Sequence, residues 1–183
     1  MNATPPPSSS GSGDATRTGG WQHGPRFAFG TLTVLPVRVT RWDRGAARSG
    51  MLWAPAAGLV AGGCAALAGS LLTVLGGGPL LAAVASVAVP AVLTRGLHLD
   101  GLADVADGLG SGRPAAGALR VMKASDIGPF GVVTLLLVLL AQVAALHGLY
   151  AAGWERGAVA AVVAGLVSRA ALTTACRRGV AAA

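Results

Sequence analysis

Residues 51–75 read MLWAPAAGLVAGGCAALAGSLLTVL, an apolar run of a length that is typical of membrane helices. The run contains no charged residue, and its one proline, Pro55, lies near its start. At about 1.5 Å rise per residue, a helix of this length can cross the roughly 30 Å hydrocarbon core of a bilayer. The stretch therefore predicts a membrane-spanning helix.

Three further apolar runs follow it along the chain. The turn signal Gly76-Gly77-Gly78-Pro79 separates the first run from the second. The second run, Leu80 to Leu93, ends near Arg95 and is short unless its helix extends through Leu97 and Leu99, so we predict a membrane helix over 80–99. The last two runs occupy residues 130–150 and 158–176, and Arg169 interrupts the second of these. We therefore predict an all-α protein, a polytopic transmembrane helix bundle with about four crossings in this chain.

The composition supports a bilayer as the main partner of this chain. Apolar residues make up 53% and charged residues only 11%, whereas a soluble domain carries about 25% charged residues. The net charge of +7 comes from arginines that flank the apolar runs, which is typical of cytoplasmic flanks of membrane helices and not of a nucleic-acid surface. Cys64 and Cys176 lie in separate apolar stretches and predict neither a disulfide nor a metal site.

The N-terminal region has a different character from the rest. Residues 1–25 are rich in Pro, Ser and Gly and lack a hydrophobic core, so we predict a disordered tail. Residues 26–183 then form the integral membrane domain. Within it, residues 26–50 are basic and mixed, and Pro36 argues against one straight helix. We interpret 26–50 as an interfacial segment.

The distribution of positive charge predicts the topology. Arginines and Lys123 gather before the first run, in 95–129 and after the last run, whereas the turn at 76–79 has none and that at 151–157 has only Arg156. Positively charged loops stay in the cytoplasm. Both termini and a segment over 95–129 are therefore expected on the cytoplasmic side of the cell membrane.

The segment 95–129 holds most of the chemistry. Asp100, Asp104 and Asp107 are spaced i, i+4 and i+7, which places them on one face of an otherwise apolar helix. Like charges one turn apart repel one another, and the cost rises beside lipid. A divalent cation would offset this, and carboxylates with substrate phosphates suit Mg²⁺. A solvated acidic face on a cytoplasmic helix is the alternative.

Further polar residues flank the three aspartates. Arg120 and Lys123 fall on one face of a predicted helix over 114–125, where they could bind phosphate oxygens or mark the cytoplasmic side. Asp126 is either a fourth metal ligand or the N-cap of the next helix, and the cap is slightly favoured. His98 is a candidate proton acceptor or a structural histidine.

These residues resemble a known family, the cobalamin synthases or adenosylcobinamide-GDP ribazoletransferases. The resemblance is carried by the motif His98-Leu-Asp100-Gly-Leu-Ala-Asp104-Val-Ala-Asp107-Gly-Leu and by residues 121–132, which read VMKASDIGPFGV. The upstream stretch from Phe29 to Gly58 is also similar. The likeness covers about residues 27–170.

The resemblance implies an integral membrane enzyme that joins adenosylcobinamide-GDP to α-ribazole, or to its 5′-phosphate, and releases GMP. It implies Mg²⁺ as the cofactor, Asp100, Asp104 and Asp107 as the acids of the site, and Lys123 as its basic residue. Partners would be these two substrates, the lipid bilayer, and either a second copy or other enzymes of cobalamin synthesis. The sequence departs from the family at Ala124, where many relatives have an acid. Relatives also continue with further apolar helices, so we expect either a fragment or a partner that supplies them.

Two other classes of protein remain as alternatives. A CDP-alcohol phosphotransferase also places acids on membrane helices, but its motif has an arginine shortly after the first Asp-Gly-x-x-Ala unit, where this chain has Asp104. A divalent-cation transporter would use intramembrane acids along an ion path, whereas these acids lie in a predicted cytoplasmic segment with basic neighbours.

Overall fold

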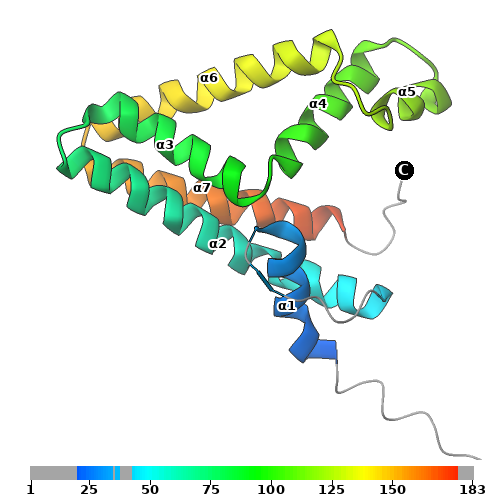
Figure 1. The fold of residues 1–183 in the computed structure, drawn as a ribbon, viewed down its shortest axis with the longest axis horizontal. Helices are drawn as coiled ribbons and strands as arrows, with labels where there is room; N and C mark the ends of the chain where they lie inside the picture. The colour runs from blue at the N-terminus through cyan, green and yellow to red at the C-terminus, as the bar shows by residue number, and fades with distance from the viewer. Residues whose placement is uncertain (1–19, 35, 38–42, 177–183) are drawn as a thin grey trace, which may run out of the picture.

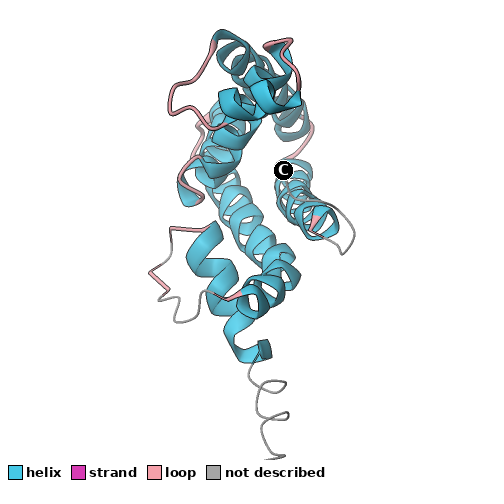
Figure 2. Ribbon diagram, turned by 90° about the vertical axis from the view of Figure 1, so that its right-hand side faces the viewer, coloured by secondary structure: helices cyan, strands magenta, loops and turns pink. Residues whose placement is uncertain are grey.

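The computed structural model describes residues 20–34, 36–37 and 43–176. Over these residues the chain forms seven α-helices and no strand (Figures 1 and 2), which confirms the all-α prediction. The helices are α1 (Gly20–Leu32), α2 (Arg44–Val74), α3 (Gly78–Leu93), α4 (Leu97–Gly110), α5 (Ala115–Met122), α6 (Pro129–Ala151) and α7 (Trp154–Ala175).

The helices α2 and α7 form the most extensive contact in the molecule and run antiparallel, side by side (Figure 1). Glycines make this close approach possible. A methyl group at Gly58 would collide with the carbonyl oxygen of Gly165, and one at Gly62 would lie 2.8 Å from the carbonyl oxygen of Ala161. Small residues at four-residue spacing let backbones pack directly in a membrane, where hydrophobic burial drives helix association little.

A buried hydroxyl pair joins α3 to α6 and α2. Ser86 on α3 donates to the carbonyl oxygen of Ala65 at 3.1 Å, and its Oγ lies 2.9 Å from the hydroxyl of Tyr150 on α6. Because the serine proton is used on Ala65, Tyr150 acts as the donor in the second bond. Tyr150 is only 2% exposed, and Gly69 and Gly157 leave the room for its ring.

The predicted helix over 80–99 is broken in the structure. The helix α3 ends at Leu93, where Gly96 N–H donates to the carbonyl oxygen of Ala91 and Arg95 N–H to that of Val92. This is a Schellman ending, and both Arg95 (φ 54°) and Gly96 (φ 70°) are left-handed. The chain then turns by 90° into α4, so residues 97–99 begin the acidic helix and do not extend α3.

In the described part of the chain, three helices are long and apolar enough to cross a membrane by themselves, and they span Gly45–Val74, Pro129–Ala151 and Trp154–Ala175. A fourth crossing is obtained if the bent pair α3 and α4 counts as one broken span. With 16 residues, α3 alone is about 24 Å long and falls short of the bilayer core. The prediction of about four crossings agrees with the upper count.

The bundle has two different ends. At one end, the turns after α2 and α6 lie together; the predicted turn at Gly76 is present, with φ 81° (Figure 1). At the other end lie α1, the start of α2, the α3–α4 bend, α5 and the end of α7 (Figure 1). The described parts of the segments predicted to share one side of the membrane therefore lie at one end of the bundle.

The N-terminal segments differ in their limits from the sequence-based prediction. The helix α1 starts at Gly20, inside the stretch interpreted as the tail, whose residues 1–19 lie outside the described part. It packs against α2, and a methyl group at Gly50 of α2 would collide with the ring of Phe27. The helix α2 begins at Arg44, where Asp43 accepts from Ala46 N–H at 2.8 Å.

Candidate active site

The buried acid of α4 is Asp107, and it is fully engaged with α6. Its Oδ2 accepts from Gly128 N–H at 2.7 Å and its Oδ1 from Gly131 N–H at 2.9 Å. Gly128 is the N-cap residue of α6, and Pro129 occupies the first helical position, where a missing N–H has no consequence. The carboxylate thus caps α6 from another helix and complements the positive end of its dipole.

The cap assignment differs from the prediction made for Asp126. The N-cap of α6 is Gly128, without a side-chain cap from its own segment, and Asp126 lies exposed two residues earlier. The preference for Asp126 as the cap was wrong because a carboxylate far along the chain already reaches the N–H groups. Its assignment as a metal ligand stays a prediction.

The other two acids of α4, Asp100 and Asp104, do not take part in the hydrogen bonds that join Asp107 to α6. Asp100 is exposed and Asp104 is partly exposed, and neither accepts a hydrogen bond from the residues that the structure describes. Among the same residues, no three His, Cys, Asp or Glu side chains converge on one point. A complete cage of protein ligands is therefore not formed, but two free carboxylates on one helix face match the open type of site in which Mg²⁺ binds phosphates.

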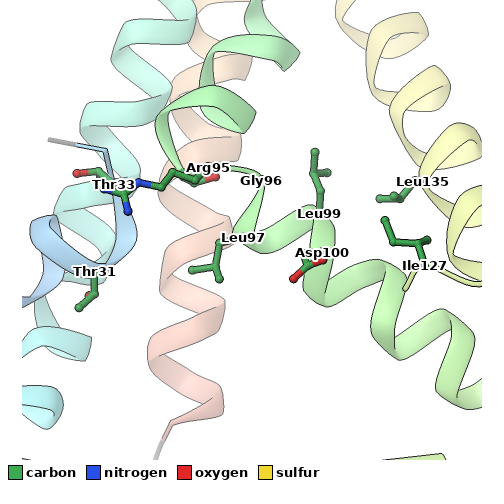
Figure 3. Close-up of a pocket in the computed structure, with 10 residues that line it drawn as sticks. Thr31, Thr33, Arg95, Gly96, Leu97, Leu99, Asp100, Ile127 and Leu135 are labelled. Carbon is green, nitrogen blue, oxygen red and sulfur yellow. The ribbon is translucent and has the colours of Figure 1, made fainter. Parts of the chain in front are cut away.

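A cavity of about 550 Å³ lies beside Asp100. Figure 3 shows Asp100 on the first turn of α4, with Arg95 extending toward Thr33 on one side and Ile127 and Leu135 on the other. Arg95 is one of the left-handed residues of the α3–α4 bend and precedes Asp100 in the chain, and both of these residues line the same cavity. A cation and an acid thus border a space large enough for a small-molecule group.

The predicted phosphate-binding cations lie on the next helix. Arg120 is exposed and donates from Nε to the carbonyl oxygen of Ala116 at 3.3 Å, and Lys123 is exposed at the C-terminal cap of α5. The helix α5 packs against α4, and Gly108 sits directly against Met122. Both cations are therefore held next to the acidic helix by this small contact, without an ion pair to the three aspartates.

His98 lies next to Arg169, a residue to which the sequence analysis gave no function. Its Nδ1 lies 3.5 Å from Nη2 of Arg169 on α7. Arg169 is 9% exposed, and its side-chain stem packs on Gly58 of α2. The signal in the sequence was the charge that interrupts the run 158–176, because a cation inside a membrane helix usually has a function.

The fold and this end of the bundle define a polytopic α-helical membrane protein with an acidic helix and nearby cations. Residues 24–183 match the family described as cobalamin-5-phosphate synthase. Because this match covers most of the sequence, the chain belongs to the cobalamin-5-phosphate synthase family. No solved structure matches the chain.

Curated relatives carry one common name, adenosylcobinamide-GDP ribazoletransferase. The chain is 45% identical over 160 residues to the protein of Frankia casuarinae, covering 82% of this chain and 57% of the relative. It is 47% identical over 125 residues to that of Thiobacillus denitrificans, covering 67% and 50%. For the protein of a Nocardioides species the values are 44% over 124 residues, 66% and 53%. The chain spans about half the length of the curated relatives it matches.

Proposed function

We propose that this protein joins adenosylcobinamide-GDP to α-ribazole, or to α-ribazole 5′-phosphate, and releases GMP. The name of the curated relatives carries the substrates and reaction type. The observation that supports them in this chain is the acidic face of α4. There Asp107 is fixed against α6, while Asp100 and Asp104 have no partner among the described residues. A site of this kind can bind the charged group of a diphosphate.

The reaction exchanges one phosphorus–oxygen bond for another. A ribose hydroxyl of α-ribazole attacks the phosphorus that carries the cobinamide, a new phosphodiester forms, and the bond to GMP breaks. The hydroxyl proton passes to Asp100 or Asp104, or to His98 as the sequence first suggested. A carboxylate is preferred here because His98 faces a guanidinium on α7. Departing GMP carries away the negative charge.

The cations of α5 and the α3–α4 bend serve the same transfer. Arg120, Lys123 and Arg95 are exposed at the end of the bundle that holds the acids. Positive groups near the transferred phosphoryl stabilise the charge that develops there. Asp107 acts as a positioning residue in this scheme because it fixes α4 against α6.

We also propose Mg²⁺ as the cofactor, with Asp100 and Asp104 as its ligands, and Asp107 or Asp126 only if its side chain rearranges. When bound, the ion would supply charge neutralisation on the diphosphate oxygens and on GMP. The free carboxylates fit this role because Mg²⁺ typically takes one or two of them together with substrate phosphates.

We further propose that the protein spans the cell membrane and that the end of the bundle with the α4 acids lies on the cytoplasmic side. The same end also carries most of the positive charge of the described residues, which comes from Arg48, Arg95, Arg113, Arg120 and Lys123. Only Arg156 lies in the turn at the opposite end, and cytoplasmic loops carry the excess of Lys and Arg.

The test is GMP release from adenosylcobinamide-GDP by membranes that contain this chain, measured with α-ribazole and Mg²⁺. The Frankia casuarinae relative provides the positive control, and membranes without either protein the blank. We expect release that requires both the acceptor and a divalent cation. Release by the relative but none by this chain would contradict the proposal for this protein.

A further inference from the structure

A second cavity, of about 530 Å³ and partly open, lies between α3, α6 and α7, with α4 at one end. Its walls are mostly aliphatic side chains. Its polar side chains include His98, Gln142, Ser168 and Arg169. A volume of this size and an apolar lining with a few convergent polar groups are typical of binding sites for small organic molecules.

Arg169 is the unusual member of this lining. The side chain is 9% exposed and comes from a helix that is long and apolar enough to cross the membrane. Its guanidinium donates from Nη1 to Ser168 Oγ at 3.1 Å and lies 3.5 Å from His98 Nδ1. No carboxylate pairs with it among the residues that the structure describes.

A buried guanidinium without an anion is unfavourable, since neither a serine nor a histidine carries negative charge. The side chain also has five N–H donors, and the two neighbours account for few of them. Its stem is held on Gly58 of α2, so the charged group stays at the cavity. An anionic ligand in the cavity would satisfy both the charge and the remaining donors.

We propose that this cavity binds an amphipathic organic phosphate, with the phosphate on Arg169 and His98 and the apolar body between α3, α6 and α7. The preferred ligand is α-ribazole 5′-phosphate, and this choice rests on the proposed function. A phospholipid headgroup offers the same chemistry. The cavity shares Thr94 and Leu99 with the cavity beside Asp100, so a bound acceptor would lie next to the acids of α4.

The experiment measures binding and needs no turnover. The full chain, purified in a neutral detergent, is titrated with α-ribazole 5′-phosphate and with α-ribazole by calorimetry. We expect the phosphorylated ligand to bind at least tenfold more tightly. In Arg169→Gln this preference should fall to less than threefold, and Arg169→Lys should restore part of it. Arg156→Gln, which removes an exposed cation from the same helix, is the matched control and should keep the preference.

A second variant covers the case in which Arg169→Gln fails to fold. Gln142 lines the cavity from α6, and Gln142→Glu would add a negative charge to the lining of the cavity that also holds the guanidinium. It should abolish the preference for the phosphate, whereas Gln142→Leu should retain it. The helical signal in the far-ultraviolet circular dichroism spectrum checks that each variant is folded.

Nanodiscs with and without phosphatidylglycerol distinguish the two sources of phosphate. If phosphatidylglycerol competes with α-ribazole 5′-phosphate in an Arg169-dependent way, both bind here. If only the lipid depends on Arg169, the cavity is a phospholipid site and the acceptor assignment is overturned. Equal affinity for α-ribazole and its 5′-phosphate, together with no Arg169-dependent lipid binding, would overturn the whole inference. GMP release is measured in a separate experiment. If no GMP is released, the proposed function is refuted, but the binding result at this cavity still stands or falls by itself.

Discussion

Asp107 on α4 accepts a 2.7 Å hydrogen bond from the backbone N–H of Gly128, the residue that begins α6. A second N–H, from Gly131, completes the pair. One carboxylate thus joins the acidic helix to a membrane-crossing helix.

Loss of this carboxylate should destabilise the α4–α6 contact. Bonds to a charged acceptor contribute about 1.5–3 kcal/mol each, and two N–H groups would lose their partner. We expect Asp107→Ala to lower the free energy of unfolding by about 3–6 kcal/mol, and Asp107→Asn by less, since one acceptor oxygen remains. Unfolding in sodium dodecyl sulfate, followed by circular dichroism, measures both. Equal stability of wild type and Asp107→Ala would show that the bonds do not hold α4.

Asp104 should behave in the opposite way, because its partly exposed carboxylate has no partner among the described residues. Asp104→Asn keeps the size of the side chain and removes its charge. We expect GMP release to fall at least a hundredfold, while membrane insertion and unfolding midpoint stay unchanged. Glu155→Gln, an exposed acid at the opposite end of the bundle, serves as the control. Normal turnover in Asp104→Asn would remove this residue from the proposed site.

The α2–α7 contact can be tested with two glycines of α2, one inside the contact and one outside it. A methyl group at Gly58 would collide with Gly165 and press on the stem of Arg169, whereas one at Gly63 meets nothing within 4 Å. Overpacking typically costs about 1–3 kcal/mol, so Gly58→Ala should destabilise the bundle by that amount. Gly63→Ala should be neutral or stabilising by up to about 1 kcal/mol through helix propensity. Comparing the two unfolding midpoints checks this, and equal values would mean that α2 and α7 pack less closely.

The buried hydroxyl pair on α3 and α6 provides a fourth prediction. Tyr150→Phe removes the donor to Ser86 but keeps the ring between Gly69 and Gly157. We expect a loss of about 1 kcal/mol, the usual net value of one hydrogen bond. Ser86→Ala should cost at least as much because it also removes the bond to Ala65. In a double-mutant cycle the two losses should not add, and full additivity would indicate that the hydroxyls do not interact.

The acids of α4 show how far the sequence could predict the site. Their spacing of i, i+4 and i+7 correctly predicts one helix, since helical periodicity is a local property. From the same spacing we predicted that all three aspartates bind one metal ion. In the structure only Asp107 is buried, because Ala103 and Gly131 let α4 and α6 approach closely at that point. Which acid faces a neighbouring helix depends on packing, so periodicity alone could not separate them.

The end of α3 and the surroundings of Arg169 also depend on the tertiary structure more than on the local sequence. Arg95 and Gly96 within residues 80–99 are a signal for the end of a helix. The 90° angle of the bend depends on the left-handed backbone of these two residues and is not given by the pattern. The interruption at Arg169 is visible in the sequence, yet its neighbour His98 lies 71 positions away. Contacts at this separation are set by how the helices are arranged.

The sequence by itself determined that the chain is helical, crosses a membrane and carries most of its charges at one end, because hydropathy, helical period and loop charge are properties of single segments. Only the tertiary structure decided that Asp107 caps α6, that Asp100 and Asp104 have no partner in the described part of the chain, and that Arg169 meets His98 at a cavity between helices. Each of these depends on the distance between helices, which small residues and buried hydrogen bonds fix together.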